Sequence, residues 1–380
     1  MLNQQCAVLT AIDSYIEPLI NRVLSTDKFG VCCETIKIDS MSSSCGSVQG
    51  DRFKLSIPYA RQNLTWNVFF DSQCPEMGPD FIFNDNTFLA DMDVDALSTK
   101  VPSLAKWNPL DENALLNVLK ELLSCYKQHQ IQLLQKQTRL QLQYNMLISS
   151  AEVEDVEVIL LPFSSKPTEV RFLISLSVDL SQLQNRTSKS ESDIVMLLVT
   201  YCGVDWNRIT PQLHFSKSLE ETLGGTGELR LPQFPSDTSL VQYILKIKKY
   251  VAGKVNSAIQ SLEKRRDYIA AFLCINHLCI LEYDTINCKY VSCILCEDDF
   301  YVVMYIQLPL GFPREAPIVE FKSVYHMSSE HVPYSEKIKH YPYDFKWPPH
   351  HMIRELYKAM YQQIKIFKLN SIKNCSENHS

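Results

Sequence analysis

The sequence predicts an α+β protein made of repeated antiparallel sheets and helices, and three observations carry this prediction. A proline followed four residues later by phenylalanine occurs three times, as Pro79-Asp-Phe-Ile-Phe83, Pro211-Gln-Leu-His-Phe215 and Pro317-Ile-Val-Glu-Phe321. Apolar strand patterns precede these motifs. A Trp-x-Pro triplet that opens a helical pattern follows the outer two, at Trp107 and Trp347. Such an internal repeat predicts architecture before any single residue predicts chemistry.

Length and composition place the chain among ordinary globular proteins. It has 380 residues, 46% hydrophobic and 21% charged, which suggests two or three domains. A net charge of -6 argues against a general nucleic-acid binder. The first 24 residues lack the pattern of a signal peptide, and no apolar run reaches membrane-spanning length. The odd number of cysteines, 13, predicts reduced thiols in the cytosol or nucleus.

The first third of the chain predicts helix, hairpin, proline strand and helix. Apolar residues at helical spacing predict a helix over 4–25, kinked at Pro18. Alternation over 53–57 and 64–70 predicts an antiparallel hairpin that leads into the first proline motif. After Trp107, a long or bent helix is expected through residue 147, with Asn108 as its cap and Pro109 in its first turn.

The rest of the chain repeats this order. Strands are expected over 156–161, 172–178 and 194–201, with a polar loop at 181–192. The glycines of 223–227 lack the Lys-Ser/Thr of a phosphate-binding loop and predict a hinge or loop. A second long helix over 237–273, strands over 277–283, 290–295 and 301–308, and a helix over 350–369 complete the pattern. We therefore expect three modules, 1–125, 126–235 and 236–380, joined by shared helices.

The basic residues of the second long helix have two interpretations. They are Lys246, Lys248, Lys249, Lys264, Arg265 and Arg266. They either form a face that binds a partner or simply solvate the exposed side of the helix.

The order of these elements resembles the ubiquitin-conjugating (E2) fold. That order is a meander, a Pro-x-x-x-Phe strand, a long loop and a helix opened by Trp-x-Pro. Cys74-Pro-Glu-Met-Gly-Pro-Asp-Phe-Ile-Phe83 stands where that family has its aromatic-Pro-x-x-Pro-Pro strand entry, with cysteine replacing the aromatic residue. Phe312-Pro-Arg-Glu-Ala-Pro-Ile-Val-Glu-Phe321 keeps the aromatic residue and continues to Val324-Tyr-His326. The middle copy lacks Trp-Pro, so its resemblance rests on strand order and one motif.

The resemblance also implies that the conjugating chemistry has been lost. An active member places its nucleophilic cysteine about eight residues before the tryptophan. That position holds Thr99 in the first copy and lies among Lys337, Ile338 and Lys339 in the third. Met327-Ser-Ser329 follows His326 where the family has the asparagine that steadies the oxyanion. The modules thus resemble inert ubiquitin E2 variant (UEV) or RWD domains, with no catalytic residue, cofactor or metal.

Over roughly 10–365 the chain is similar to the BRE family. The similarity rests on Asp51-Arg-Phe-Lys-Leu-Ser-Ile-Pro-Tyr59, Lys264-Arg-Arg-Asp-Tyr-Ile-Ala-Ala-Phe-Leu273, Phe321-Lys-Ser-Val-Tyr-His326 and Tyr341-Pro-Tyr343. It implies a non-catalytic scaffold subunit of the BRISC deubiquitinase and of its nuclear DNA-damage counterpart, which cut chains linked through ubiquitin's lysine sixty-three.

The same similarity implies the partners and the location. A JAMM-type zinc metalloprotease subunit, held by an Abraxas-type partner, would supply catalysis, and a von Willebrand A-like subunit would dock on this chain. The similarity implies that the chain binds ubiquitin without conjugating it. It implies no direct contact of the chain with nucleic acid or membrane. We expect cytoplasmic and nuclear locations that follow the partners.

Three sharper alternatives stand beside this interpretation. Cys125 would have to act as nucleophile if the chain were an active conjugating enzyme. His277, Cys279, Cys288, Cys293 and Cys296 crowd together, with a ligand-like Cys-x-x-Cys, yet fit buried strand positions better than a zinc site. Tyr334, Tyr341, Tyr343 and Trp347 either line a peptide groove, as in related UEV folds, or pack a loop over the sheet. A stand-alone ubiquitin or peptide receptor is the remaining rival function.

Overall fold

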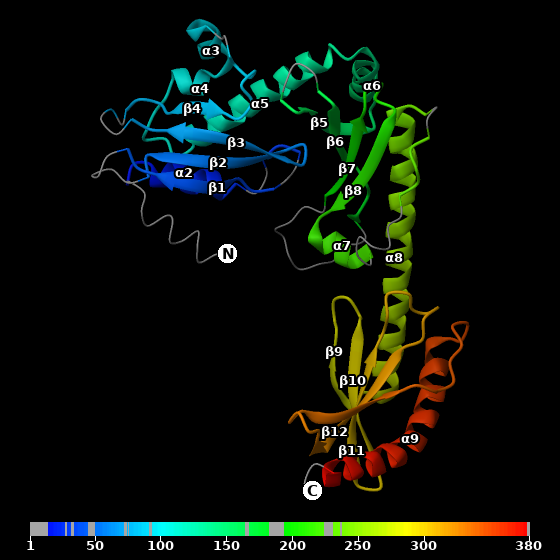
Figure 1. Cartoon of the computed structure of the whole chain (residues 1–380). Helices are drawn as coiled ribbons and strands as arrows, with labels where there is room; N and C mark the ends of the chain where they lie inside the picture. Colours follow the sequence, from blue (N-terminus) through cyan, green and yellow to red (C-terminus); the bar gives the residue numbers. More distant parts are fainter. Residues whose placement is uncertain are drawn as a thin grey trace. The chain divides into compact units, whose positions relative to one another are not determined.

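The computed structural model describes residues 14–26, 29–31, 34–44, 50–71, 74, 76–90, 93–163, 167–181, 194–223, 231–235 and 238–377. Within them the chain is α+β, with three antiparallel sheets separated by helices, as the sequence predicts (Figure 1). Residues 224–227 of the expected hinge or loop and most of the polar loop at 181–192 lie outside the described residues.

The first sheet is a four-stranded meander. Its strands are β1 (Lys37–Ser42), β2 (Arg52–Tyr59), β3 (Gln62–Phe69) and β4 (Asp80–Phe83), hydrogen-bonded in that order. β2 and β3 pair from Arg52↔Phe69 to Tyr59↔Gln62, so the predicted hairpin is confirmed. Its tip is tight because Ala60 and Arg61 both adopt positive φ.

Two predicted helices of this region differ from expectation. The described part of the first is α2 (Glu17–Leu24), which has Pro18 in its first turn and a turn at 14–16 before it, so the predicted helix is interrupted just before the proline. Residues 4–13 lie outside the described part of the chain. α5 spans Ala114–Leu134, so the prediction that Asn108 caps it is wrong. The Asn108 side chain instead accepts the Leu110 N–H at 3.1 Å and holds a turn before the helix.

The remaining described helices of this region flank α5 in the sequence. The short helices α3 (Val94–Lys100) and α4 (Pro102–Ala105) precede it. α6 (Thr138–Ile148) follows after a break at 135–137, which bears out the alternative of a bent helix.

The middle region forms a second four-stranded meander. It consists of β5 (Val153–Leu161), β6 (Glu169–Leu176), β7 (Val195–Cys202) and β8 (Arg208–Phe215), followed by α7 (Lys217–Leu223). The three expected strands are confirmed to within a few residues. Pro211 lies inside β8, an edge strand, where a missing N–H donor is tolerated.

The C-terminal region contains a long helix, a five-stranded sheet and a final helix. α8 spans Leu240–Asn276 and α9 spans Pro349–Glu377. Between them β9 (Ile280–Tyr283), β10 (Tyr290–Glu297), β11 (Phe300–Gln307), β12 (Ile318–Met327) and β13 (Pro333–Ile338) pair in sequence order. The expected strands and helices of this region are present, and β13 is an additional strand.

Each proline motif belongs to the fourth strand of a meander. Pro79 directly precedes β4, Pro211 lies in β8, and Pro317 directly precedes β12. The sequence repeat therefore marks the same structural position three times.

The chain divides into two compact units. The first holds the two N-terminal sheets and α8 up to Lys249, and the second holds the rest of α8, the five-stranded sheet and α9. In the first unit one hydrophobic core joins Trp66 and Leu119 to Ile159 and Leu173 of the middle sheet. In the second, Phe272 of α8 and Phe367 of α9 pack with Met304 of the sheet. The predicted division into three modules stays a prediction.

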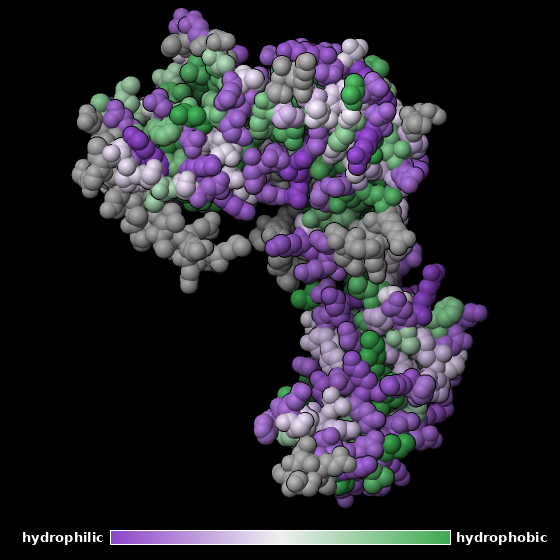
Figure 2. Space-filling view, in the orientation of Figure 1, coloured by the Kyte–Doolittle hydropathy of each residue, from purple (hydrophilic) through white to green (hydrophobic). Residues whose placement is uncertain are grey.

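None of the described helices is long and apolar enough to cross a bilayer. The face drawn in Figure 2 mixes hydrophilic and apolar residues, with hydrophilic side chains predominating over much of it.

Candidate functional site

The two positions expected for a conjugating cysteine carry no thiol. Thr99 lies exposed near the end of α3, where its hydroxyl donates to the Asp95 carbonyl at 2.9 Å. Lys337 and Ile338 end β13, opposite Glu320 and Val319 of β12, and Lys339 follows. A helical threonine and an edge-strand lysine cannot form the thioester that conjugation requires.

The residues expected near an oxyanion also have structural partners. The His326 backbone N–H donates to the Ser323 hydroxyl at 3.0 Å, and its ring Nδ1 lies 3.0 Å from the Ser371 hydroxyl of α9. Ser328 forms the turn after β12, where its N–H donates to the Val332 carbonyl at 2.8 Å. The His326 ring therefore holds the end of β12 against α9, and Ser328 closes the turn that follows β12.

Cys125, the alternative nucleophile, is a poor one. It lies on α5, and its Sγ is 3.7 Å from the Lys100 carbonyl oxygen. Partial burial raises its thiol pKa, so the thiolate that attacks a thioester is scarce at neutral pH.

The cysteines considered for zinc behave mainly as apolar residues. Cys293 is buried in the C-terminal core, its Sγ is 3.5 Å from the Tyr357 hydroxyl, and burial raises its pKa to about 11. Cys288 is also buried and its pKa is raised by burial, whereas His277 and Cys296 are exposed. Across the part of the chain that is described, no three His, Cys, Asp or Glu residues group as a metal site.

The four candidate partner-binding aromatics all pack against the C-terminal core and remain partly exposed. The Tyr341 hydroxyl donates to the Pro317 carbonyl, and the Tyr343 hydroxyl donates to the Pro313 carbonyl. Burial raises the pKa of both, that of Tyr343 to about 12.

The rings of the four aromatics also pack on neighbouring rings. Trp347 packs on His351 with ring centroids 4.7 Å apart, and Tyr334 packs on Phe367 with ring centroids 5.4 Å apart. Tyr341 and Tyr343 lie together, with ring centroids 6.4 Å apart, and both tie the segment after β13 to the third proline motif.

The basic residues of α8 do not form one exposed face. Arg265 is buried, while Lys246, Lys249, Lys264 and Arg266 are exposed. Lys248 is occupied, because its Nζ donates to the Glu152 carbonyl at 2.6 Å and lies 2.9 Å from the Glu152 carboxylate. The basic residues of α8 therefore do not form a continuous exposed stripe.

A buried carboxylate that the sequence did not single out joins the first two sheets. Glu157 of β5 accepts the Val31 N–H and the Ala60 N–H, each at 2.7 Å. Beside it, the Tyr59 hydroxyl donates to the Val158 carbonyl at 3.1 Å. Burial raises the pKa of Glu157, and the two N–H donors oppose that shift. No local pattern reveals this site, because its donors lie 126 and 97 residues away.

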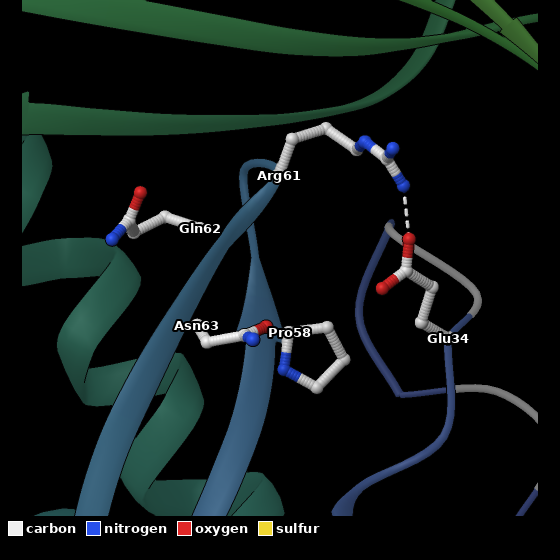
Figure 3. A pocket seen from close by; sticks show the side chains of 5 residues that line it. All are labelled: Glu34, Pro58, Arg61, Gln62 and Asn63. Carbon is white, nitrogen blue, oxygen red and sulfur yellow. Dashed lines mark hydrogen bonds and ion pairs between the residues drawn. The ribbon is translucent and has the colours of Figure 1, made fainter.

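A polar cavity of about 320 Å³ opens at the tip of the β2–β3 hairpin (Figure 3). It is lined by Glu34, Pro58, Arg61, Gln62 and Asn63, and Arg61 forms an ion pair with Glu34. Apart from Pro58, the described lining residues carry polar or charged side chains, which suit a polar ligand.

Comparison with known proteins identifies the family. The family model of "Brain and reproductive organ-expressed protein (BRE)" matches residues 10–327. The chain belongs to the BRE family. A relative from Branchiostoma floridae, named "BRISC and BRCA1-A complex member 2", is 32% identical over 96% of this chain and 97% of its own length. A Danio rerio relative of the same name is 32% identical over 91% and 92%. Membership of the BRE family confirms the resemblance inferred from the sequence.

Proposed function

We propose that this chain is a non-catalytic scaffold subunit of a deubiquitinase complex of the BRISC or BRCA1-A type. The observation that carries the proposal is the threefold meander with its proline strand, in which Thr99 and Lys337–Lys339 occupy the positions of a nucleophile. The relatives' names, which describe complex members, support it. We interpret the three sheets as UEV/RWD-like modules over 1–125, 126–235 and 236–380.

The proposed partners follow from this role. A JAMM-type metalloprotease with an Abraxas-type partner supplies cleavage of lysine-sixty-three-linked chains, and a von Willebrand A-like subunit docks on this chain. The chain itself contributes ubiquitin binding and acts in both cytoplasm and nucleus according to its partners. The extended shared core of the first unit suits a rigid platform for such subunits.

Affinity capture of the full chain, followed by mass spectrometry, tests the proposal. We expect the metalloprotease and the Abraxas-type subunit in near-stoichiometric amounts. Recovery of ubiquitin or peptide ligands without either subunit would favour the stand-alone receptor. A second assay addresses the conjugating enzyme: incubation with an activating enzyme, ATP and ubiquitin should give no adduct that reducing agent cleaves.

Two finer parts of the proposal have their own measurements. Titration of the chain with lysine-sixty-three-linked diubiquitin, followed by NMR, should give saturable shifts; their absence would remove ubiquitin binding from the role. Imaging of a fluorescent fusion should show nuclear accumulation only when the nuclear partners are present, and entry without them would contradict a partner-dependent location.

A further inference from the structure

Five exposed apolar side chains lie on the edge strand β9 and on the residues that flank it. Leu278 is 86% exposed, Leu281 53% and Tyr283 40%, and Ile275 and Ile286 beside them are also exposed. All five belong to one short stretch from the end of α8 to the β9–β10 turn. Scattered exposed apolar residues are normal, but a cluster on a strand edge marks a surface that another chain covers.

The backbone of β9 is half-paired. β9 is the last strand of its sheet and bonds only to β10 among the described strands (Figure 1). It pairs through Tyr283↔Val291 and Glu282↔Ser292, and the Asp284 N–H donates to the Tyr290 carbonyl at 3.0 Å. In an antiparallel ladder, alternate residues point their N–H and C=O groups away from the partner. Tyr283 is in that outward-facing register, so its backbone groups face the open edge.

The opposite edge of the same sheet is protected in the usual way. β13 begins with Pro333 and carries Glu336 and Lys337, and proline and charge on an edge discourage strand addition. The pairing of β9 with β10 has a register shift at Ser292/Cys293 of β10. Unlike β13, which carries Glu336 and Lys337, β9 exposes a leucine and a tyrosine. The two edges are thus differently suited to a partner.

We propose that β9 is a docking edge that takes an extended segment of a partner subunit as an additional strand. Main-chain hydrogen bonds supply the affinity, and alternate apolar residues of the segment contact Leu278, Leu281 and Tyr283. Glu282 is an exposed carboxylate in the middle of the strand, and it selects a lysine or arginine on the incoming segment. A second copy of this chain fits poorly, because antiparallel pairing of two β9 strands about Glu282 or Tyr283 places Glu282 opposite Glu282 or Asp284 of the other copy, and like charges repel.

The inference rests on the proposed function, because the partner is a subunit of that complex. Hydrogen–deuterium exchange on the full chain, alone and in the complex rebuilt from the metalloprotease, Abraxas-type and von Willebrand A-like subunits, tests it. We expect amides of 279–284 to exchange at least tenfold more slowly in the complex, while those of 333–338 do not change. Leu281→Lys should weaken assembly about tenfold or more. Val332→Lys, at a similarly exposed turn of the same unit, should not.

The outcomes separate the two claims. A complex that forms without protecting 279–284, or that tolerates L281K, would overturn the docking edge and leave the scaffold role intact. Failure of the complex to form would contradict the scaffold role and the docking edge with it. Protection that rises with the concentration of the chain alone would indicate a second copy as occupant and overturn the proposal of a partner strand.

Discussion

At the scale of single residues, Glu157 shows how one buried carboxylate fixes two sheets in place. It accepts backbone N–H groups from the β2–β3 hairpin tip and from the segment before β1. Each N–H would otherwise be buried without an acceptor, which costs about 1–3 kcal/mol. Ionised carboxylates are costly to bury, and this explains why the native pKa of Glu157 is raised despite two donors.

We expect Glu157→Gln to destabilise the first unit by about 1–3 kcal/mol, because an amide can accept through only one of its two groups. The effect should depend on pH. Since the native pKa is raised, the folded state keeps a proton that the unfolded state has lost, so this group's contribution falls as pH rises from the ordinary carboxyl range through the native pKa. The deficit of the variant should therefore be largest in acid and narrow with rising pH. Urea unfolding at several pH values measures it, and a deficit that widens instead would contradict the raised pKa.

Tyr341 and Tyr343 provide a second test among single residues. Replacing each with phenylalanine keeps the ring and removes the hydroxyl that donates to Pro317 or Pro313. We expect each variant to lose about 0.5–1.5 kcal/mol of unfolding free energy in the second unit. Tyr361→Phe, at an exposed ring of α9, is the matched control and should change little.

The peptide-groove hypothesis makes a separate claim about the same cluster. If the aromatics form a groove, Trp347→Ala should weaken partner binding while the melting temperature changes little. Unchanged partner binding and unchanged stability together would remove the groove from consideration.

Sequence could not have revealed the residue-level contacts. The absence of a thiol at Thr99 and at Lys337–Lys339 follows from spacing alone once the resemblance to the E2 fold is assumed. The role of Glu157 does not, because a carboxylate in an apolar strand has the same sequence signature whether it is paired or exposed. Asn108 was misassigned because an asparagine before proline suits both a helix cap and a turn, and only the backbone beyond it decides.

At the scale of elements, Lys248 anchors α8 to the middle sheet. Its ammonium group contacts the Glu152 carbonyl and carboxylate and lies 3.0 Å from the Ser177 hydroxyl. We expect Lys248→Met to lower the unfolding free energy of the first unit by about 1–2 kcal/mol, less than a fully buried pair because Glu152 is partly exposed.

Lys246→Met is the control on the same helix, since Lys246 is exposed. The urea concentration at which half of the Lys246→Met variant is unfolded should stay close to that of the unsubstituted protein. Equal losses in both variants would mean that Lys248 stabilises through charge alone and not through its specific contacts.

Strands and helices with strong periodicity were predictable from sequence, and the shorter elements were not. Alternation over 53–57 and 64–70 predicted the β2–β3 hairpin because one face of it is buried. β1 and β13 escaped prediction because both are exposed edge strands with mixed polar sequences and few apolar residues. The break between α5 and α6 was expected only as a bend, because leucines at helical spacing continue across it.

At the scale of the whole molecule, the fold repeats one arrangement of strands three times. Three meanders place the proline strand at equivalent positions, and the first two share one core through Ile159, Leu173 and the side chains of α5. In the proposed scaffold role, each of the three sheets would offer a surface to partners. The sequence predicted this architecture and family. It could not predict which surfaces partners use, because exposure of β9 depends on strand order in the folded sheet.

Reconstitution from purified subunits tests the scaffold role most directly. The chain would be mixed with the JAMM-type metalloprotease, the Abraxas-type partner and the von Willebrand A-like subunit, and the mass of the products measured by light scattering during gel filtration. We expect one complex that contains this chain, and recruitment of the von Willebrand A-like subunit only when the chain is present. A metalloprotease complex that forms and retains all its other subunits while this chain elutes alone would contradict the account.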